Sequence, residues 1–201
     1  MSPLPPLAKA GLVLLLLALA GCTAPMQMAL AEPAAAPVRK AAAARVPVAF
    51  APFVDQRPDF QRESAGNVGG RAVVAKNVAT WVNRSLQNLG GRHFQPGRAD
   101  DPAAWQITPR LRQFYASSLR VSKNANIVIE LEIRPPTGEP LTRIYRGRVT
   151  SVNWWGTSDE VEAAVTDAFR DCLKRVATDI DQLVLDSSAG RRTQETSRAG
   201  L

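Results

Sequence analysis

One long apolar stripe constrains the fold of this 201-residue chain more than any other feature. Between Val161 and Val184 apolar side chains recur every three or four residues, the period of one face of an α-helix. The four residues 157–160 (TSDE) directly before the stripe have the pattern of a capping box, which predicts where the helix begins. A stripe of this length has to pack on a sheet or on another helix, so it predicts a layered fold.

The strands expected beside this helix follow from the alternation of apolar and polar residues. In 125–134 (ANIVIELEIR) every second side chain is apolar, and 141–152 (LTRIYRGRVTSV) follows after a turn rich in proline, which predicts a hairpin. Further strands are expected at 46–54 and 105–115, and apolar spacing predicts a second helix over about 73–89. The order β-α-β-β-β-α predicts an α+β fold with a mixed, mainly antiparallel sheet and two helices packed on one face.

The N-terminus has the pattern of an export signal. Lys9 precedes an apolar run at 11–20 that is too short to span a bilayer stably. The run ends in the sequence LAGC at 19–22, which resembles the lipobox of bacterial lipoproteins. That resemblance implies cleavage between Gly21 and Cys22 and acylation of the Cys22 thiol, for example with palmitate, which would anchor the chain in a membrane. The alternatives are an ordinary signal peptide with a chance cysteine, or a buried apolar helix.

The chain is expected to divide into four segments. These are a signal peptide (1–21), a lipid-anchored tether rich in alanine and proline (22–45), a globular α+β domain (46–185) and a disordered polar tail (186–201). A coil of the tether's length would span on the order of 25–30 Å. The lipoprotein resemblance implies that a chain with Thr23, in place of an aspartate after the cysteine, is sorted to the outer membrane, on its periplasmic face, in a Gram-negative bacterium.

The net charge of +7 does not itself indicate a function. The tether is the most basic segment per residue, and basic and acidic residues nearly balance in 46–185. An exported lipoprotein would rarely meet nucleic acid, so no nucleic-acid partner is expected. The expected partners are the membrane, through the lipid anchor, and another protein of the cell envelope.

The sequence offers no set of residues that predicts catalysis or metal binding. The single histidine, His93, has no serine or cysteine motif beside it, and Cys172 lies on the apolar stripe, where an inert buried thiol is expected. With one histidine and two cysteines, a His/Cys metal cage is nearly excluded. We therefore expect no metal, no cofactor and no enzymatic activity. The glycine-rich segment 66–71 (GNVGGR) lacks the G-K-[ST] ending of a phosphate loop and is expected to be a flexible connection from strand to helix.

The best candidates for contact with a partner lie near the end of the hairpin. Trp154 and Trp155 are adjacent, so alternating geometry would leave one of them facing outward. Equally, both tryptophans could pack inside the fold and hold the helix against the sheet. Arg146 and Arg148 on the outer face of the hairpin complete the candidate contact surface.

Ion pairs are expected at two places. Arg146 and Arg148 could face Glu130 and Glu132 across the strand pair, which would help to fix its register. In 55–59 (DQRPD) the carboxylates and the arginine are expected to pair with one another or with neighbouring backbone, as in a turn.

The order of several motifs resembles the YajG family of uncharacterised bacterial lipoproteins. They are the lipobox, a first strand that ends in DQR at 55–57, LRQFYA at 111–116, AxIxI at 125–129, RxY at 143–145 and ExxVxxAFxDxL at 162–173. The likeness covers about 46–185. It implies a lipid-anchored periplasmic domain without established catalytic residues.

Three hypotheses of function remain open. The first is a non-catalytic binding or scaffold module of the cell envelope. The second, an auxiliary lipoprotein of a lipid-trafficking ABC-type transport system, requires an apolar groove between helix and sheet that is wide enough for an acyl chain. The third, a hydrolase, requires a cleft with converging titratable groups and is the weakest.

Overall fold

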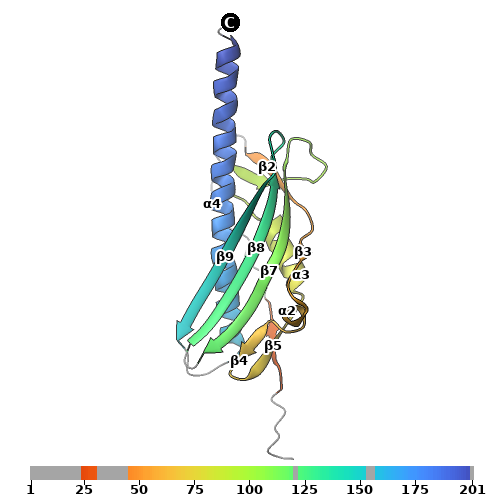
Figure 1. Cartoon of the computed structure of the whole chain (residues 1–201), viewed down its shortest axis with the longest axis vertical. Helices are drawn as coiled ribbons and strands as arrows, with labels where there is room; N and C mark the ends of the chain where they lie inside the picture. The colour runs from red at the N-terminus through yellow and green to blue at the C-terminus, as the bar shows by residue number, and fades with distance from the viewer. Residues whose placement is uncertain (1–23, 31–44, 120–121, 153–156, 200–201) are drawn as a thin grey trace, which may run out of the picture.

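The computed structural model of the chain describes residues 24–30, 45–119, 122–152 and 157–199. Within these residues, nine strands form one sheet (Figure 1). The strands are β1 (Met26–Ala29), β2 (Val46–Phe50), β3 (Val54–Asp55), β4 (Gly66–Val68), β5 (Arg71–Lys76), β6 (Phe94–Pro96), β7 (Trp105–Leu119), β8 (Ser122–Arg134) and β9 (Leu141–Val152). The helices are α2 (Asp59–Glu63), α3 (Val78–Gln87) and α4 (Ser158–Ala199).

The long strand β7 organises the sheet. One of its edges pairs antiparallel with β8 from end to end, and β8 in turn pairs antiparallel with β9. The other edge of β7 is shared by β2, β3 and β4, which pair with it in parallel one after another. Beyond them, β6 pairs with β2, and β5 and β1 continue from β4. The α+β fold with a mixed sheet is therefore confirmed, although it has more strands than the sequence predicts.

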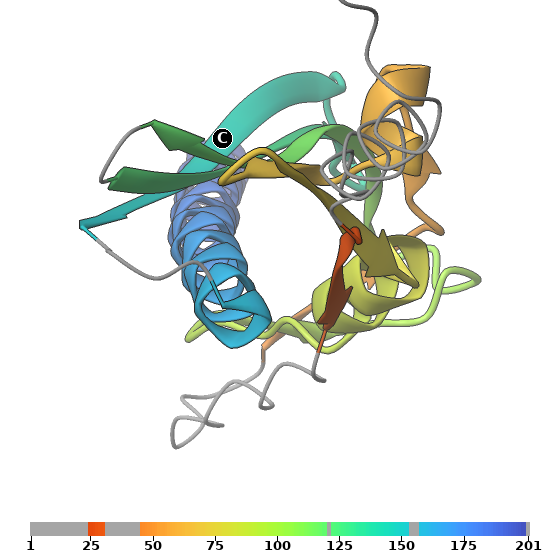
Figure 2. The same cartoon turned by 90° about the horizontal axis from the view of Figure 1, so that it is seen from below.

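The two longer helices cover one face of this sheet. Trp81 of α3 packs on Phe169 of α4 with ring centroids 4.2 Å apart, and its edge meets Phe114 of β7 at 6.2 Å. Both phenylalanines are fully buried, so these rings tie α3, α4 and β7 into one core. Seen along the molecule, α4 and α3 lie on the same side of the β7–β9 layer (Figure 2). The opposite face of β7, β8 and β9 faces the viewer in Figure 1.

The hairpin and the start of the last helix agree with the sequence. The alternating residues of β8 that the pattern places inside the fold, Ile127, Ile129, Leu131 and Ile133, are at most 1% exposed. At the start of α4, the backbone N–H of Glu160 donates to Thr157 Oγ1 at 3.4 Å, and a Glu160 carboxylate oxygen accepts from the backbone N–H of Thr157 at 3.1 Å. This reciprocal pair is the expected capping box.

The segment before α3 differs from the prediction. The predicted helix over about 73–89 begins only at Val78, and Arg71–Lys76 form β5. The predicted flexible connection at 66–71 is a tight hairpin, in which Gly69 and Gly70 have φ of 61° and 77° and join β4 to β5. Two glycines at positive φ make the two-residue turn that best fits the twist of paired strands, so this glycine motif has a conformational purpose.

Both expected unstructured segments contain regular structure. Met26–Ala29, inside the predicted tether at 22–45, form β1, which pairs with β5 and buries Met26 and Met28. The predicted tail at 186–201 continues α4 as far as Ala199, past the end of the apolar stripe. This stretch holds glutamine, glutamate, alanine and arginine without proline, so a helix already formed by packing can extend through it. Its last turns project beyond the sheet (Figure 1).

Candidate functional site

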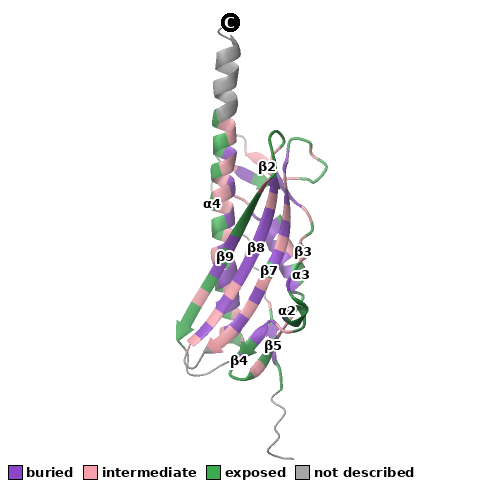
Figure 3. Cartoon of the chain, viewed as in Figure 1, coloured by how far each residue is buried: buried purple, intermediate pink, exposed green. Residues whose placement is uncertain are grey.

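The candidate site is the surface where the last strand of the sheet meets α4. We call it the β9–α4 surface and define it by Arg143, Arg146 and Arg148 of β9 together with Lys174, Arg175 and Asp179 of α4. β9 pairs only with β8 among the described strands, so its other edge has no strand beside it. In Figure 3 exposed residues follow β9 and the side of α4 that faces away from the core. The surface thus combines an open strand edge with a charged helix flank.

Close packing at one glycine brings α4 to β9. Tyr145 and Gly147 lie on the side of β9 that faces the helix, and both are buried. Arg146 and Arg148 alternate with them and are exposed. A Cβ atom on Gly147 would lie 1.8 Å from the carbonyl oxygen of Ala168 and 2.9 Å from Cys172 Cβ. Only a residue without a side chain lets the helix backbone come this close to the strand. The glycine therefore sets the distance between β9 and α4.

A buried phenol and a carboxylate join β9 and α4 further along their contact. The Tyr145 hydroxyl donates to Asp179 Oδ2 at 2.5 Å, and Arg143 Nε lies 3.9 Å from the same oxygen. Burial, then the hydrogen bond to Asp179, raise the pKa of Tyr145 far above its usual range, so its hydroxyl keeps its proton. This phenol is a hydrogen-bond donor that orients Asp179 and does not act as a base.

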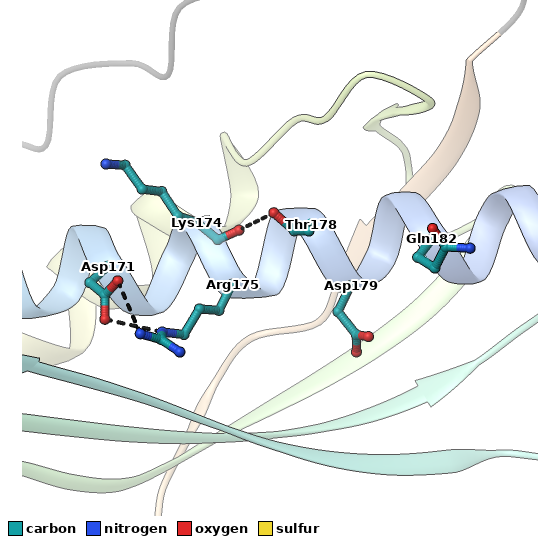
Figure 4. A pocket seen from close by; sticks show the side chains of 6 residues that line it. All are labelled: Asp171, Lys174, Arg175, Thr178, Asp179 and Gln182. Carbon is teal, nitrogen blue, oxygen red and sulfur yellow. Dashed lines mark hydrogen bonds and ion pairs between the residues drawn. The ribbon is translucent and has the colours of Figure 1, made fainter.

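The flank of α4 beside this pair is a shallow hollow. It is lined by Asp171, Lys174, Arg175, Thr178, Asp179 and Gln182 (Figure 4). Within it Arg175 Nε donates to Asp171 Oδ2 at 3.1 Å, and the Thr178 hydroxyl donates to the Lys174 carbonyl at 2.9 Å. A neighbouring hollow shares Arg175 and Asp179 and adds Arg143, Ile144, Tyr145 and Arg146. Charged and polar side chains predominate in both.

The β9–α4 surface carries cationic groups without internal partners. Among the described residues, Arg146, Arg148 and Lys174 form no ion pair, whereas Arg175 is paired with Asp171. Ile144, which alternates with Arg146 on the outer side of β9, is 56% exposed. An apolar side chain among unpaired cations suits contact with a surface that is anionic and partly apolar.

The expected pairing of Arg146 and Arg148 with Glu130 and Glu132 is wrong. The hairpin turn sets Ile133 opposite Leu141, and this register places Arg146 opposite Val128 and Arg148 opposite Asn126. The two arginines are exposed as expected, but they have no carboxylate across the strand pair.

The carboxylates of β8 pair with arginines of β7 instead. Arg110 reaches both Glu130 at 3.0 Å and Glu132 at 2.7 Å, and Arg112 reaches Glu130 at 2.7 Å. Hydrogen bonds from Arg112 and then Arg110 lower the pKa of Glu130, and one from Arg134 lowers that of Glu132. These two carboxylates stay ionised at neutral pH and are fully engaged by Arg110, Arg112 and Arg134, so neither of them forms an ion pair with the β9 arginines.

The other candidates have structural positions. Cys172 is fully buried, and burial raises the pKa of its thiol to about 12, which agrees with an inert thiol. His93 lies in the loop before β6, where its backbone N–H donates to Asp181 of α4 at 2.8 Å. The buried Arg57 guanidinium donates to both Asp55 oxygens, at 2.9 and 2.8 Å, as the turn interpretation predicts.

The structure does not describe four of the predicted site residues. Gly21, Cys22, Trp154 and Trp155 lie outside the described residues. Within the described ranges, no group of three or more histidine, cysteine, aspartate or glutamate side chains could hold a metal ion. In the same part of the chain, none of the helices has the length and apolar character needed to cross a membrane.

Sequence reasoning missed Tyr145 and Asp179. Asp179 lies seven residues after Cys172 and three after Val176, so it interrupts an otherwise apolar helix face. Tyr145 alternates with Gly147 on the inward side of β9. A carboxylate that interrupts the apolar spacing of a helix and a hydroxyl on the buried face of a strand together indicate a hydrogen bond between the layers, and this signal is visible in the sequence.

Comparison with known proteins gives structural likenesses only. No family model and no curated protein matches the chain. Protein XCC0632 from Xanthomonas campestris, a DUF330 protein, is 16% identical with a TM-score of 0.48, over 85% of this chain and 98% of that one. An uncharacterized protein is 10% identical with a TM-score of 0.46, over 68% and 96%. Lipoprotein GNA1162 from Neisseria meningitidis is 12% identical with a TM-score of 0.28, over 62% and 96%. The YajG resemblance rests on sequence motifs and stays a prediction.

Proposed function

We propose that this chain is a lipid-anchored lipoprotein of the bacterial outer membrane, whose domain faces the periplasm and binds an envelope protein without catalysing a reaction. The LAGC sequence at 19–22 supports the anchor, because it follows an apolar run of signal-peptide length. The binding role rests on the β9–α4 surface. There, within the part of the chain that the structure describes, Arg146, Arg148 and Lys174 form no ion pair and lie beside a strand edge that pairs with no other strand.

The kind of partner follows from that surface. Unpaired guanidinium groups next to an exposed isoleucine favour a protein surface that carries carboxylates around an apolar centre. Trp154 and Trp155 follow β9 in the sequence, and we include them in the proposed contact. No metal, cofactor or nucleic acid takes part in this function.

The anchor is tested by removing the acylated thiol. In a Gram-negative host the full chain is expected in the outer-membrane fraction, and Cys22→Ala is expected to leave that fraction, because no thioether-linked lipid can form. Two or three acyl chains, each methylene contributing about 0.8 kcal/mol on burial, make the anchored state effectively permanent. Cys172→Ala, which removes a buried thiol, is the matched control and should stay with the membrane. A Cys22→Ala chain that still fractionates with the outer membrane would contradict the proposed anchor.

The partner contact is tested by in-cell crosslinking followed by mass spectrometry. The double charge reversal Arg146→Glu with Arg148→Glu is expected to lower the yield of the crosslinked partner about tenfold or more, since it turns attraction into repulsion. Arg92→Glu with Arg98→Glu makes the same change in net charge on exposed residues elsewhere and is the control. An equal loss in both variants would show that only net charge matters.

The same experiment separates the second candidate function. Recovery of a component of a lipid-trafficking ABC-type transporter as the crosslinked partner would favour the auxiliary-lipoprotein role. Recovery of another envelope protein would favour the scaffold role. A partner whose yield survives both the arginine reversals and Trp154→Ala with Trp155→Ala would exclude the β9–α4 surface as the contact.

A further inference from the structure

We infer that the domain stands with one end directly on the lipid bilayer and is not suspended from it by a tether. This inference rests on the proposed acylation of Cys22 and concerns the orientation that the anchor imposes. The surface in question is the end of the domain where β1 begins, which we call the anchor end. It shares none of the six residues that define the β9–α4 surface; Trp154 and Trp155, which the proposed protein contact also includes, follow Val152 of this end in the sequence.

The distance from the acylated residue to the fold is short. Arg71 Nε donates to the Ala24 carbonyl at 3.1 Å, so the chain is already fixed to β5 two residues after Cys22. Two residues span at most about 7 Å when fully extended. Met26–Ala29 are part of the sheet, with Met26 and Met28 buried. The lipid would thus be attached within about 7 Å of a fixed point on the domain.

Several elements end around that fixed point. The turn between β4 and β5 lies beside the end of β7, because the Gly69 N–H donates to Ser118 Oγ at 2.7 Å. Ser122, the first residue of β8, pairs with Leu119 on one side and with Val152, the last residue of β9, on the other. Lys123 binds Glu160 at 2.6 Å and so joins the start of α4 to the same end. Figure 1 shows these strand ends together at the bottom of the molecule.

The described residues of the anchor end suit contact with lipid headgroups. Gly69 and Gly70 have open space around them, and Val152 is 74% exposed. The charges of Lys123 and Glu160 neutralise each other. The Arg71 side chain also lies at this end, where it donates a hydrogen bond to the Ala24 carbonyl. An exposed valine and a bare glycine turn carry no charge of their own, so these two groups can approach the headgroup region without the cost of burying one.

This orientation directs α4 away from the membrane. The helix begins at the anchor end with Ser158, and Asp181 reaches the loop before β6 at the opposite end, where it accepts the N–H groups of Arg92 and His93. A helix of 42 residues is about 63 Å long. The C-terminal turns of α4 would therefore be carried far from the bilayer, in reach of components that the anchored end cannot contact.

Fluorescence quenching on vesicles tests the orientation. The lipidated full chain is reconstituted in phosphatidylcholine–phosphatidylglycerol vesicles that contain a lipid with a nitroxide on its headgroup. A fluorophore is attached to a single new cysteine, with Asn67→Cys or Val152→Cys at the anchor end and Thr137→Cys at the other end, all at exposed positions. Cys172 is fully buried and stays unlabelled. We expect about fivefold or more quenching at the anchor end over Thr137→Cys, because the 13 residues of β8 separate the two ends by about 43 Å.

A variant with a real tether is the control. Insertion of about ten glycine and serine residues between Thr23 and Ala24 adds a coil that spans on the order of 17 Å, and it should remove most of the difference between the two ends. Equal quenching at both ends in the unmodified, vesicle-bound chain would overturn the inference and leave the anchor intact. A chain that carries no lipid and does not float with the vesicles would instead overturn the proposed function, and the orientation with it.

Discussion

Replacing Gly147 with alanine is expected to destabilise the domain by about 3 kcal/mol or more. The added Cβ would lie 1.8 Å from the Ala168 carbonyl oxygen, far inside van der Waals contact, and the backbone of α4 cannot yield as a flexible side chain would. Relief requires the helix to move off β9, which also stretches the hydrogen bond from Tyr145 to Asp179. Overpacking a well-packed interior costs typically 1–3 kcal/mol, and a clash between two backbones belongs at the upper end of that range or beyond it.

Thermal denaturation of the unlipidated chain measures this effect. In a domain of this size, 1 kcal/mol corresponds to a shift in Tm of about 2–4 °C, so Gly147→Ala should lower Tm by about 6–12 °C or abolish folding. Gly90→Ala makes the same substitution where the new Cβ would meet only Pro96 Cδ at 3.8 Å, and it should change Tm little. Equal, small shifts in both variants would show that α4 does not pack on β9 as closely as described. If Gly147→Ala does not fold, an intact Gly90→Ala still supports the steric explanation.

This close approach also shows how far the sequence predicts the fold. The apolar stripe of α4 and the alternation in β8 and β9 predict a helix over a hairpin, because burial repeats at the period of each element. The distance between the layers depends on which residue of β9 meets which turn of α4. Periodicity contains no such information, and so the role of Gly147 is apparent only in three dimensions.

Register explains why the candidate site was only partly predicted. The spacing of Glu130 and Glu132 permits several arginine partners, and the choice between them depends on the hairpin turn and on the neighbouring strand β7. Because Ile133 pairs with Leu141, neither Glu130 nor Glu132 lies opposite Arg146. Both carboxylates form ion pairs with Arg110 of β7 instead. The exposure of Arg146 follows from alternation alone, whereas its lack of a partner follows from the register.

The short strands escaped prediction for a different reason. β3, β4 and β6 have two or three residues each, too few for an alternating pattern to be recognised. β3 and β4 form because β7 offers a long edge whose backbone groups require partners, and β6 pairs with β2, which itself pairs with β7. β1 likewise pairs with β5 from within a segment whose alanines and prolines indicate a coil.

Met28→Ala tests whether β1 belongs to the core, and its expected effect is of the same size as that of Gly147→Ala. Met28 is 2% exposed and packs in the same core as Val73 of β5, so truncation leaves a cavity that typically costs 2–5 kcal/mol for a methionine. Gln27→Ala, on the exposed side of the same strand, is the matched control. A tether predicts no change in the free energy of unfolding for either variant. A clear loss at position 28 with none at 27, in denaturant unfolding of the unlipidated chain, would establish that the fold begins four residues after Cys22. If the free energy of unfolding falls at neither position, the segment is a tether, as the sequence predicts, and the domain is free to turn above the membrane.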